Sequence, residues 1–464
     1  MSTLDELSAL IQERLPGLLA EHRVPAAAVA VYAHGEVADC AAGTLSGSTG
    51  VEATRDSLFQ IGSITKVWTA TLAMQLVDEG KLDLDDPVCR CLPEFAVADR
   101  DAARRITVRQ LLCHTAGFEG DIFTDTGKGD DCVEKFVATL GDVPQLFAPG
   151  QMFSYNNAAY CVLGRIIEVL RDKPYDDCLR EHLFTPLGLA HAANGPYEAI
   201  LHRAAVGHLT PAPGADPQPA PVWALARSNA PAGSMLSTSA RDLLAFARLH
   251  LDQGKGPDGA AVLSAGSAAA MQRRQVELPY LGILGDAWGL GWEIFDWDGR
   301  TVIGHDGGTI GQSAFLRVVP DRQVAVAVLT NGGSPLPLYT EIVGRVLREL
   351  ADVTMPPLPA PGAGRERTAV DASRYVGAYS SCVADVVVTQ DPEGRVWVER
   401  TPKGELAALM GAPEKTELVA MRGDTLLTAT PKDGMYLPHA FVGDDGEGRA
   451  LYVHTGRADR RVSA

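Results

Sequence analysis

The segment FQIGSITKVWTATLAMQLVDEG, residues 59–80, places a long helical pattern directly behind a serine. Ser63 and Lys66 stand three positions apart at the start of this pattern, and Gly80 supplies a stop at its end. Residues three apart share one face of a helix, so we expect the Lys66 amine beside the Ser63 hydroxyl. Burial lowers the pKa of a lysine, and a neutral lysine can take the proton of a serine nucleophile. Taken alone, Ser-x-x-Lys also fits a helix cap with a solvated lysine.

Strand patterns near both ends of the first 350 residues enclose this helix. Two apolar runs, 26–33 and 36–42, meet at a His-Gly turn, and two others, 313–319 and 324–330, flank a Pro-Asp-Arg turn. Further helices are predicted over residues 107–113, 157–171, 239–252 and 336–351. These patterns predict an α+β fold, in which a mainly helical lobe is inserted into an α/β lobe whose antiparallel sheet is flanked by helices. We expect the site in the cleft between the two lobes.

A proline- and glycine-rich segment divides the chain. We predict a catalytic domain over residues 1–352, a linker over 353–369 and a β-domain over 370–464. Within the catalytic domain, the α/β lobe comprises about residues 1–62 and 285–352, and the helical lobe about residues 63–284. Beyond the linker, short strand patterns alternate with Asp/Gly turns. They predict a small antiparallel β-barrel.

Tyr155 and Asn157 stand where a loop enters a helix. A tyrosine at such a junction can relay a proton between nucleophile and leaving group, and the Asn157 amide can hold the lysine and the substrate amide. A turn with an asparagine cap is the alternative interpretation.

A third cluster, His305-Asp-Gly-Gly, precedes the late hairpin. Its glycines would allow the backbone to approach a ligand closely, and we expect the backbone N–H groups of Gly308 and Ser63 to form an oxyanion hole. A glycine turn with an exposed histidine is the alternative. His454-Thr-Gly has the same His-x-Gly form, but it lies in the predicted β-domain, so His305 is the preferred candidate.

The composition excludes several classes of partner. The 464 residues include 41 Lys and Arg against 58 Asp and Glu, and the resulting net charge of −17 disfavours nucleic acids and anionic membranes as partners. Asp5, Glu6 and Glu13 interrupt the first apolar segment, so we expect a cytoplasmic protein rather than an exported one. Eight scattered cysteines lack the C-x-x-C pattern of metal or redox sites. We therefore expect no metal, no cofactor and no required disulfide.

Taken in order, Ser63-x-x-Lys66, Tyr155-x-Asn157 and His305-x-Gly307 resemble the three motifs of the penicillin-recognising serine enzymes. This superfamily includes class C β-lactamases, DD-carboxypeptidases, D-aminopeptidases, esterases and transacylases. The resemblance covers about residues 5–350 and extends to the segments ITVRQLLCHTAGF (106–118), FAPGQMFSYNNAAY (147–160), PLGL (186–189), PAGSMLSTSARDLLAF (231–246) and WGLGW (288–292).

The resemblance implies a role for each motif residue. Ser63 would be the nucleophile, Lys66 the general base, Tyr155 the proton shuttle and Asn157 a polar positioner. His305 and Gly307 would occupy the third motif beside the substrate, and the N–H groups of Ser63 and Gly308 would receive the oxyanion.

The third motif departs from the Lys-Thr-Gly of β-lactamases and most transpeptidases, whose lysine draws in the substrate carboxylate. A histidine is only partly charged near pH 7, and Asp306 places a negative charge beside it. Esters, amides and peptides are therefore better candidate substrates than a strongly anionic β-lactam.

The C-terminal β-domain resembles the lipocalin-like appendage of some of these enzymes, notably in the run YVGAYSS at 375–381. In peptide-cyclising thioesterases of the superfamily such a domain helps to close over the substrate. Four arginines could meet a substrate carboxylate, and Arg449 is our candidate among Arg449, Arg457, Arg460 and Arg461. A solvated basic tail is the alternative. Residues 120–132 could line the cleft mouth or form a solvated loop.

These observations favour an intracellular serine hydrolase or transacylase that acts on an ester, thioester or amide through a Ser63 acyl-enzyme. Its partners would be a small-molecule or peptide acyl donor and a water or amine acceptor. One alternative is a natural-product acyltransferase for amide ligation or peptide macrocyclisation, similar to penicillin-binding-protein-type thioesterases. A catalytically silent binding or scaffold module is another. A conventional α/β-hydrolase is disfavoured, because the chain lacks a G-x-S-x-G motif.

Overall fold

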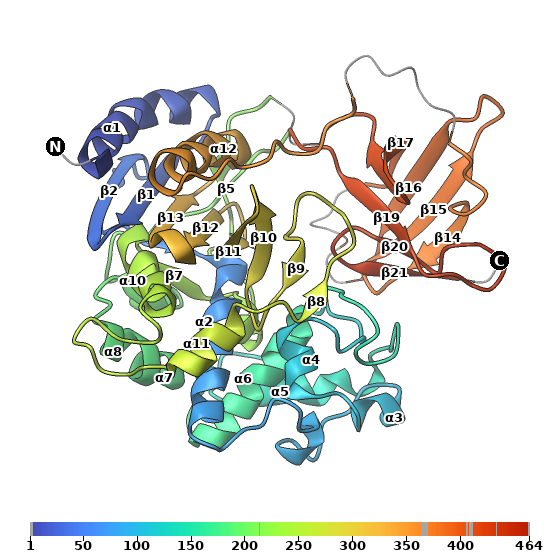
Figure 1. Cartoon of the computed structure of the whole chain (residues 1–464), viewed down its shortest axis with the longest axis horizontal. Coiled ribbons are helices and arrows are strands. Elements are labelled where there is room, and N and C mark those ends of the chain that lie inside the picture. The colour runs from blue at the N-terminus through green and yellow to red at the C-terminus, as the bar shows by residue number, and fades with distance from the viewer. Residues whose placement is uncertain are drawn as a thin grey trace.

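The computed structural model describes residues 3–212, 214–362, 370–404, 407, 412–432 and 434–462. It contains a large mixed α/β domain followed by a closed β-barrel (Figure 1). The predicted fold class is therefore confirmed.

An antiparallel eight-stranded sheet forms the centre of the large domain, with the order β2-β1-β13-β12-β11-β10-β9-β8. Its strands are β1 (Ala26–Ala33), β2 (Glu36–Gly43), β8 (Val276–Glu277), β9 (Ala287–Trp288), β10 (Glu293–Trp297), β11 (Arg300–Gly308), β12 (Ser313–Val319) and β13 (Val324–Thr330). Both predicted hairpins are present, as β1-β2 and β12-β13. Strands from the two ends of the domain meet where β1 pairs with β13.

Helices cover both faces of this sheet. Figure 1 shows α1 (Thr3–Glu21) and α12 (Pro335–Val346) on one face and α10 (Ala240–Leu251) on the other. The β1 sequence AAAVAVYA is buried along its whole length, because alternate residues enter the separate cores on the two faces.

The helical lobe is built around α2 (Thr65–Asp78), which is buried on nearly all sides. Gly80 has φ +68, the left-handed geometry expected of a helix stop. The other helices of this part are α3 (Arg100–Ala103), α4 (Val108–Leu112), α5 (Cys132–Ala138), α6 (Asn157–Arg171), α7 (Tyr175–Leu179), α8 (Thr185–Leu187), α9 (Pro196–Ala199) and α11 (Ala265–Met271). Two small sheets accompany these elements: β3 (Phe59–Gln60), β4 (Ala192–Asn194) and β7 (Leu236–Thr238) form one, and β5 (His208–Leu209), which lies beside the large sheet, pairs with β6 (Gln218–Pro219) to form the other.

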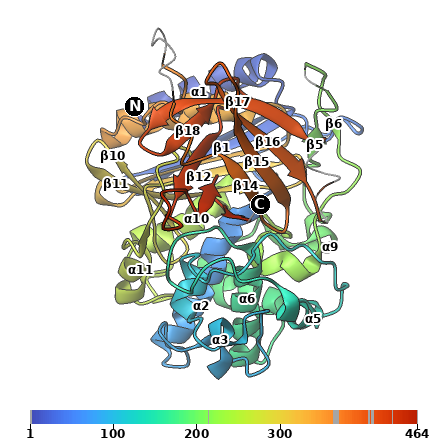
Figure 2. The same cartoon turned by 90° about the vertical axis from the view of Figure 1, so that its right-hand side faces the viewer.

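The C-terminal barrel closes where β14 pairs with β21. Its strands are β14 (Gly377–Ser380), β15 (Ala384–Gln390), β16 (Val396–Pro402), β17 (Glu414–Arg422), β18 (Thr425–Thr428), β19 (Pro438–Val442), β20 (Tyr452–His454) and β21 (Ala458–Arg461). Alternate residues of β15 are buried, as expected for a strand with one face inside a barrel. Figure 2 looks onto the barrel, which stands in front of the large sheet and above α5 and α6.

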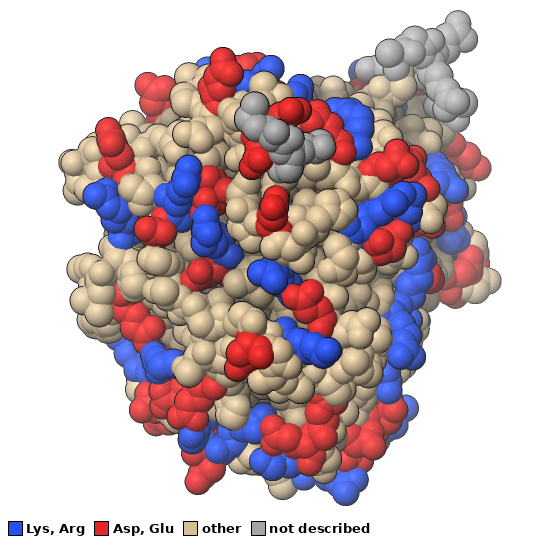
Figure 3. Space-filling view, turned by 60° about the vertical axis from the view of Figure 1, so that its left-hand side comes forward, with Lys and Arg blue, Asp and Glu red and all other residues tan. Residues whose placement is uncertain are grey.

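The last helical turn of the large domain ends at Ala351, and the first barrel strand begins at Gly377. Of the predicted linker 353–369, residues 363–369 lie outside the described residues. All eight cysteines are free thiols. In the described part of the chain, no helix is both long and apolar enough to cross a bilayer. Acidic and basic side chains are interspersed over the face seen in Figure 3.

Candidate active site

Ser63 lies in a 3-10 turn, Gly62–Ile64, directly before α2. Strand β11 passes so close to this turn that a Cβ on Gly307 would stand 1.9 Å from the Ile61 carbonyl oxygen. A Cβ on Gly62 would stand 2.6 Å from the Gly308 nitrogen. Only glycine allows this approach, which brings the backbone of Gly308 beside that of Ser63. The arrangement suits the predicted oxyanion hole.

Lys66 lies beside Ser63, one helical turn along the chain. Its Nζ donates to the Ser63 Oγ over 3.2 Å and to the Ala232 carbonyl oxygen over 2.6 Å. The side chain is fully buried, and this burial is the main reason why the pKa of Lys66 falls to about 7; the charge of Arg457 lowers it further. A substantial fraction of the amine is therefore neutral near pH 7 and can accept the serine proton.

Tyr155 closes the other side of the Lys66 amine. The Nζ lies 4.8 Å from the centroid of the Tyr155 ring. Burial raises the pKa of Tyr155, and the neighbouring Ser63 side chain opposes that rise, although the phenol hydroxyl has no hydrogen-bond partner among the described residues. The phenol thus stays protonated at neutral pH and lies within reach of the serine hydroxyl. The sequence-predicted group of Ser63, Lys66 and Tyr155 is assembled in the structure.

Asn157 joins this group through a partner that sequence reasoning missed. Its Nδ2 donates to the Asp121 Oδ1 over 2.6 Å, and this contact takes the place of the expected one to Lys66. Asp121 also forms an ion pair with Arg457, between Oδ2 and Nε, at 2.5 Å. The acidic segment 120–132 therefore contributes Asp121 to the site, as one of its two proposed interpretations allowed.

Arg457 enters from the barrel, on the turn between β20 and β21. Its Cζ lies 4.7 Å from the centroid of the Tyr155 ring, while 44% of the side chain stays accessible to solvent. Desolvation favours the neutral guanidinium, but the charge and hydrogen bond of Asp121 together with Tyr155 and Asp459 outweigh it, so the pKa of Arg457 is raised. The result is a partly exposed cation beside Tyr155.

Backbone hydrogen bonds fix this turn against the large domain. The Tyr155 N–H donates to the Gly456 carbonyl oxygen over 3.0 Å, and the Ala458 N–H donates to the Ser154 Oγ over 3.1 Å. The His454 Nε2 donates to the Phe153 carbonyl oxygen over 2.9 Å. The His-x-Gly sequence at 454 thus anchors the barrel beside the cleft.

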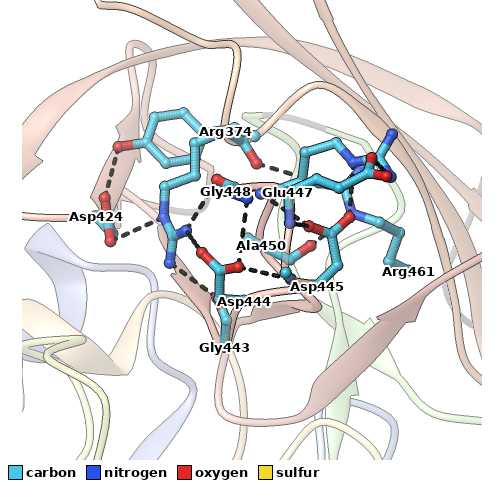
Figure 4. Close-up of polar contacts among 12 residues, drawn as sticks. Arg374, Asp424, Gly443, Asp444, Asp445, Glu447, Gly448, Ala450 and Arg461 are labelled. Carbon is cyan, nitrogen blue, oxygen red and sulfur yellow. Dashed lines mark hydrogen bonds and ion pairs between the residues drawn. The ribbon is translucent and has the colours of Figure 1, made fainter.

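Arg449 does not join the cluster, so its predicted role in substrate binding is not supported. Its Nε pairs with Asp445 and its Nη2 with Glu447, each over 2.7 Å. These two acidic residues belong to the exposed polar network of Figure 4. The turn that carries them joins β19 to β20, and successive turns of an antiparallel barrel lie at opposite ends, so Arg449 is remote from the turn that carries Arg457.

His305 lies next to Tyr155, with their ring centroids 6.2 Å apart, but it differs from the expected partly charged group. Its side chain is 1% exposed, and this burial lowers the pKa of His305 to about 3, with Lys66 adding to the effect. The Nδ1 donates to the Asp306 carbonyl oxygen over 2.6 Å. His305 is therefore a neutral histidine at pH 7.

Asp306 turns away from this histidine toward Arg317. The Arg317 guanidinium donates to both carboxylate oxygens, over 2.6 and 3.0 Å. The negative charge beside His305 is thus paired on β12, and the cation next to Tyr155 is Arg457 instead of the third-motif residue.

His114 is a further neighbour of Tyr155 that the sequence did not single out for function. The two rings stack with their centroids 4.4 Å apart. The Asn156 N–H donates to the His114 Nδ1 over 2.9 Å, and burial lowers the pKa of this imidazole well below its ordinary value. A neutral ring therefore supports the phenol from behind. The only feature of the sequence that could have indicated His114 is its position in the segment 106–118, which resembles a segment of the penicillin-recognising enzymes.

Comparison with known proteins agrees with this architecture. The profile of the family described as Beta-lactamase matches residues 10–348. The chain belongs to the Beta-lactamase family. A relative in this family, "Penicillin-binding protein 4" of Amycolatopsis lactamdurans, is 48% identical over 371 residues, which are 79% of this chain and 96% of the relative.

Two solved structures extend the comparison. The crystal structure of SurE matches this chain with 29% sequence identity and a TM-score of 0.80, and the match covers 99% of this chain and 100% of SurE. A second structure of SurE contains D-Leu. The D-amino acid amidase from Ochrobactrum anthropi SV3, complexed with L-phenylalanine amide, has 25% identity and a TM-score of 0.62, and the match covers 75% of this chain and 99% of the amidase. The likeness to SurE thus includes the barrel, in accord with the predicted lipocalin-like appendage of this Beta-lactamase family member.

Proposed function

We propose that the protein is a serine hydrolase or transacylase that acts on an ester, thioester or amide through a covalent Ser63 acyl-enzyme. The observation that carries this proposal is the hydrogen bond of 3.2 Å between the buried Lys66 amine, whose pKa is about 7, and the Ser63 hydroxyl. A neutral amine at that position is the base that a serine nucleophile needs.

In the first half-reaction, Lys66 takes the Ser63 proton as the Oγ bonds to the carbonyl carbon of the donor. The negative charge that develops on the carbonyl oxygen meets the N–H groups of Ser63 and Gly308. The protonated Lys66 then returns the proton, through the Tyr155 hydroxyl, to the leaving group as its bond to the carbonyl carbon breaks. In the second half-reaction, water or an amine bonds to the acyl carbon and gives its proton through Tyr155 to Lys66, and Lys66 returns the proton to the Ser63 Oγ as the bond from Oγ to the acyl carbon breaks.

The cleft also supports a substrate class. Since His305 is neutral, the cation near the nucleophile that can meet a carboxylate is Arg457. Amino-acid and peptide-type substrates carry such a carboxylate, either on the donor or on the acceptor. The D-Leu of one SurE structure is an amino acid that carries such a carboxylate, whereas the L-phenylalanine amide of the amidase structure is an amino-acid amide without one.

Acyl transfer in natural-product synthesis, as amide ligation or peptide macrocyclisation, is the second candidate. The observation that favours it is the barrel turn at Gly456 and Arg457, which lies against Tyr155 as a wall beside the Ser63 group. A wall of this kind can exclude water and hold an amine acceptor near the acyl-enzyme.

A set of peptidyl thioester and ester donors, offered with and without amines, tests the proposal. We expect turnover by the wild-type protein and by Ser48→Ala, which changes an exposed serine, and none by Ser63→Ala. Amide products would identify transfer, whereas hydrolysis with every amine would count against it. If no donor is consumed or acylates the protein, the binding or scaffold alternative becomes the better account.

A further inference from the structure

Gly308 supplies one of the two oxyanion donors in the proposed reaction, yet nothing packs against its open side. The residue is exposed, and a Cβ on it would meet no atom within 4 Å. Strand pairing aligns it with Ser313, but this pairing ties β11 to β12 and not to the turn that carries Ser63. A glycine without packing has wide conformational freedom. The residues on either side of Gly308 must therefore fix its N–H relative to that of Ser63.

A hydrogen bond between two side chains supplies part of this control. On one side of Gly308, Gly307 lies against the Ile61 carbonyl oxygen, as its missing Cβ allows. On the other side, the Thr309 Oγ1 donates to the Gln60 Oε1 over 2.6 Å. Gln60 lies on β3, three residues before the nucleophile. The bond therefore joins the two chain segments that carry the oxyanion donors.

The Gln60 side chain has little freedom of its own. The residue is 1% exposed, and its Nε2 donates to the Trp223 carbonyl oxygen over 2.8 Å. Because a carbonyl oxygen can only accept, the amide nitrogen must face Trp223, and the Oε1 must face Thr309. Gln60 thus presents one fixed acceptor to the Thr309 hydroxyl.

Gln312 forms a second link between the same segments. Its Oε1 accepts the backbone N–H of Gln60 over 3.0 Å, and its carbonyl oxygen accepts the N–H of Thr309 over 3.0 Å. Its Nε2 donates to the Ala205 carbonyl oxygen over 3.3 Å. This link holds the β11-β12 turn near β3. The bond from Thr309 is the one that acts on the residue directly after Gly308.

We propose that Gln60 and Thr309 are positioning residues of the oxyanion hole, and that the hydrogen bond between them aligns the Gly308 N–H with the Ser63 N–H. This role rests on the proposed function, because an oxyanion forms only if Ser63 attacks a carbonyl. Both N–H groups must point at the oxygen as its charge develops. A misaligned Gly308 should therefore slow acylation more than it weakens substrate binding.

Acylation kinetics with an ester and with the matching thionoester test the proposal. In the thionoester, a larger sulfur replaces the carbonyl oxygen, so N–H groups placed for oxygen stabilise its charge less. Thr309→Val keeps the size of the side chain and removes the hydroxyl. We expect it to slow acylation by the ester about tenfold or more, with KM within about threefold, because an oxyanion donor is misplaced but not lost. The thionoester should slow by about threefold or less, whereas a general loss of structure would slow both alike.

Three further variants complete the experiment. Thr309→Ser keeps the hydroxyl and should restore acylation to within about threefold of the wild type. Thr301→Val, at an exposed position near the other end of β11, is the matched control and should stay within about twofold. Gln60→Leu removes the same bond from its other end and should also slow the ester selectively. The double variant should be no slower than Gln60→Leu alone, since both changes break one bond.

A folded Thr309→Val that acylates the ester at the wild-type rate would overturn the proposal. Equal slowing of ester and thionoester, or an equal loss in Thr309→Ser, would also overturn it. If neither compound acylates the wild type, the proposed function fails, and this role fails with it. If neither Thr309→Val nor Gln60→Leu retains the wild-type far-UV circular dichroism, a crystal of the wild type with a phosphonate on Ser63 decides. The phosphonyl oxygen must then contact both N–H groups while Thr309 still donates to Gln60, and a broken bond there would overturn the proposal.

Discussion

The guanidinium of Arg457 lies over the ring of Tyr155, with its Cζ 4.7 Å from the ring centroid. Arg457 belongs to the barrel and Tyr155 to the large domain, and Asp121 holds the arginine in place through an ion pair. The positive charge lowers the pKa of both Lys66 and Tyr155. The barrel therefore takes part in the electrostatics of the site as well as in its shape.

Arg457→Gln should lower kcat/KM about 10- to 100-fold for substrates that carry a carboxylate, because a charge-assisted hydrogen bond to the substrate is lost. It should also move the pH profile of acylation to higher pH, since Lys66 loses a neighbouring positive charge. Steady-state kinetics across pH 5–9 check both effects. Arg460→Gln, which changes an exposed arginine three residues further along the chain, is the control. Its kcat/KM should stay within about twofold of the wild-type value. An unshifted profile in Arg457→Gln would contradict the electrostatic role.

Gly307→Ala should reduce kcat about 100-fold or more, a loss typical of removing an oxyanion donor. Its new Cβ would stand 1.9 Å from the Ile61 carbonyl oxygen, so β11 must move away from the Ser63 turn. Gly308→Ala is the matched variant, because its Cβ meets no atom within 4 Å and its N–H is kept. We expect at most a severalfold loss for Gly308→Ala. Equal losses in the two variants would argue against the close approach of strand and turn.

The rate of acylation should rise with pH and level off above about pH 7, because only the neutral form of Lys66 accepts the Ser63 proton. His305 should add no step between pH 5 and 8, since burial holds its pKa near 3. Stopped-flow acylation with an ester whose leaving group does not titrate in this range measures the profile. A rate that falls as the pH rises from 6 to 8 would be inconsistent with a lysine base.

Lys66→Met should abolish turnover and raise the thermal midpoint at pH 7 by a few degrees. In the folded protein the pKa of Lys66 is about 7, against an ordinary value of 10.5, so between these values the unfolded chain binds more protons. Stability of the wild type therefore rises with pH across this window, and burial of the lysine costs most at its lower end. The midpoint difference between Lys66→Met and the wild type should shrink from pH 7 to pH 9. Calorimetry at both pH values checks this, and a difference that grows would refute the buried neutral amine.

The features that sequence predicted well are local. Ser63 and Lys66 meet because three residues make nearly one helical turn, and the hairpin at 26–43 follows from strand alternation about a His-Gly turn. Arg457 could not be chosen over Arg449 in this way, because only the docking of the barrel decides which turn meets Tyr155. The neutral state of His305 could likewise not be predicted from the sequence, because the burial of its side chain depends on strands from distant parts of the chain.

The central claim is that Ser63 becomes acylated with the help of a neutral Lys66. Rapid quench of the protein with an activated thioester, followed by peptide mapping, tests it most directly. The account predicts one acyl group, on the peptide that carries Ser63, which forms within the first turnover and is missing from Ser63→Ala and Lys66→Met. Turnover without any covalent adduct, or an acyl group on a different residue, would contradict it.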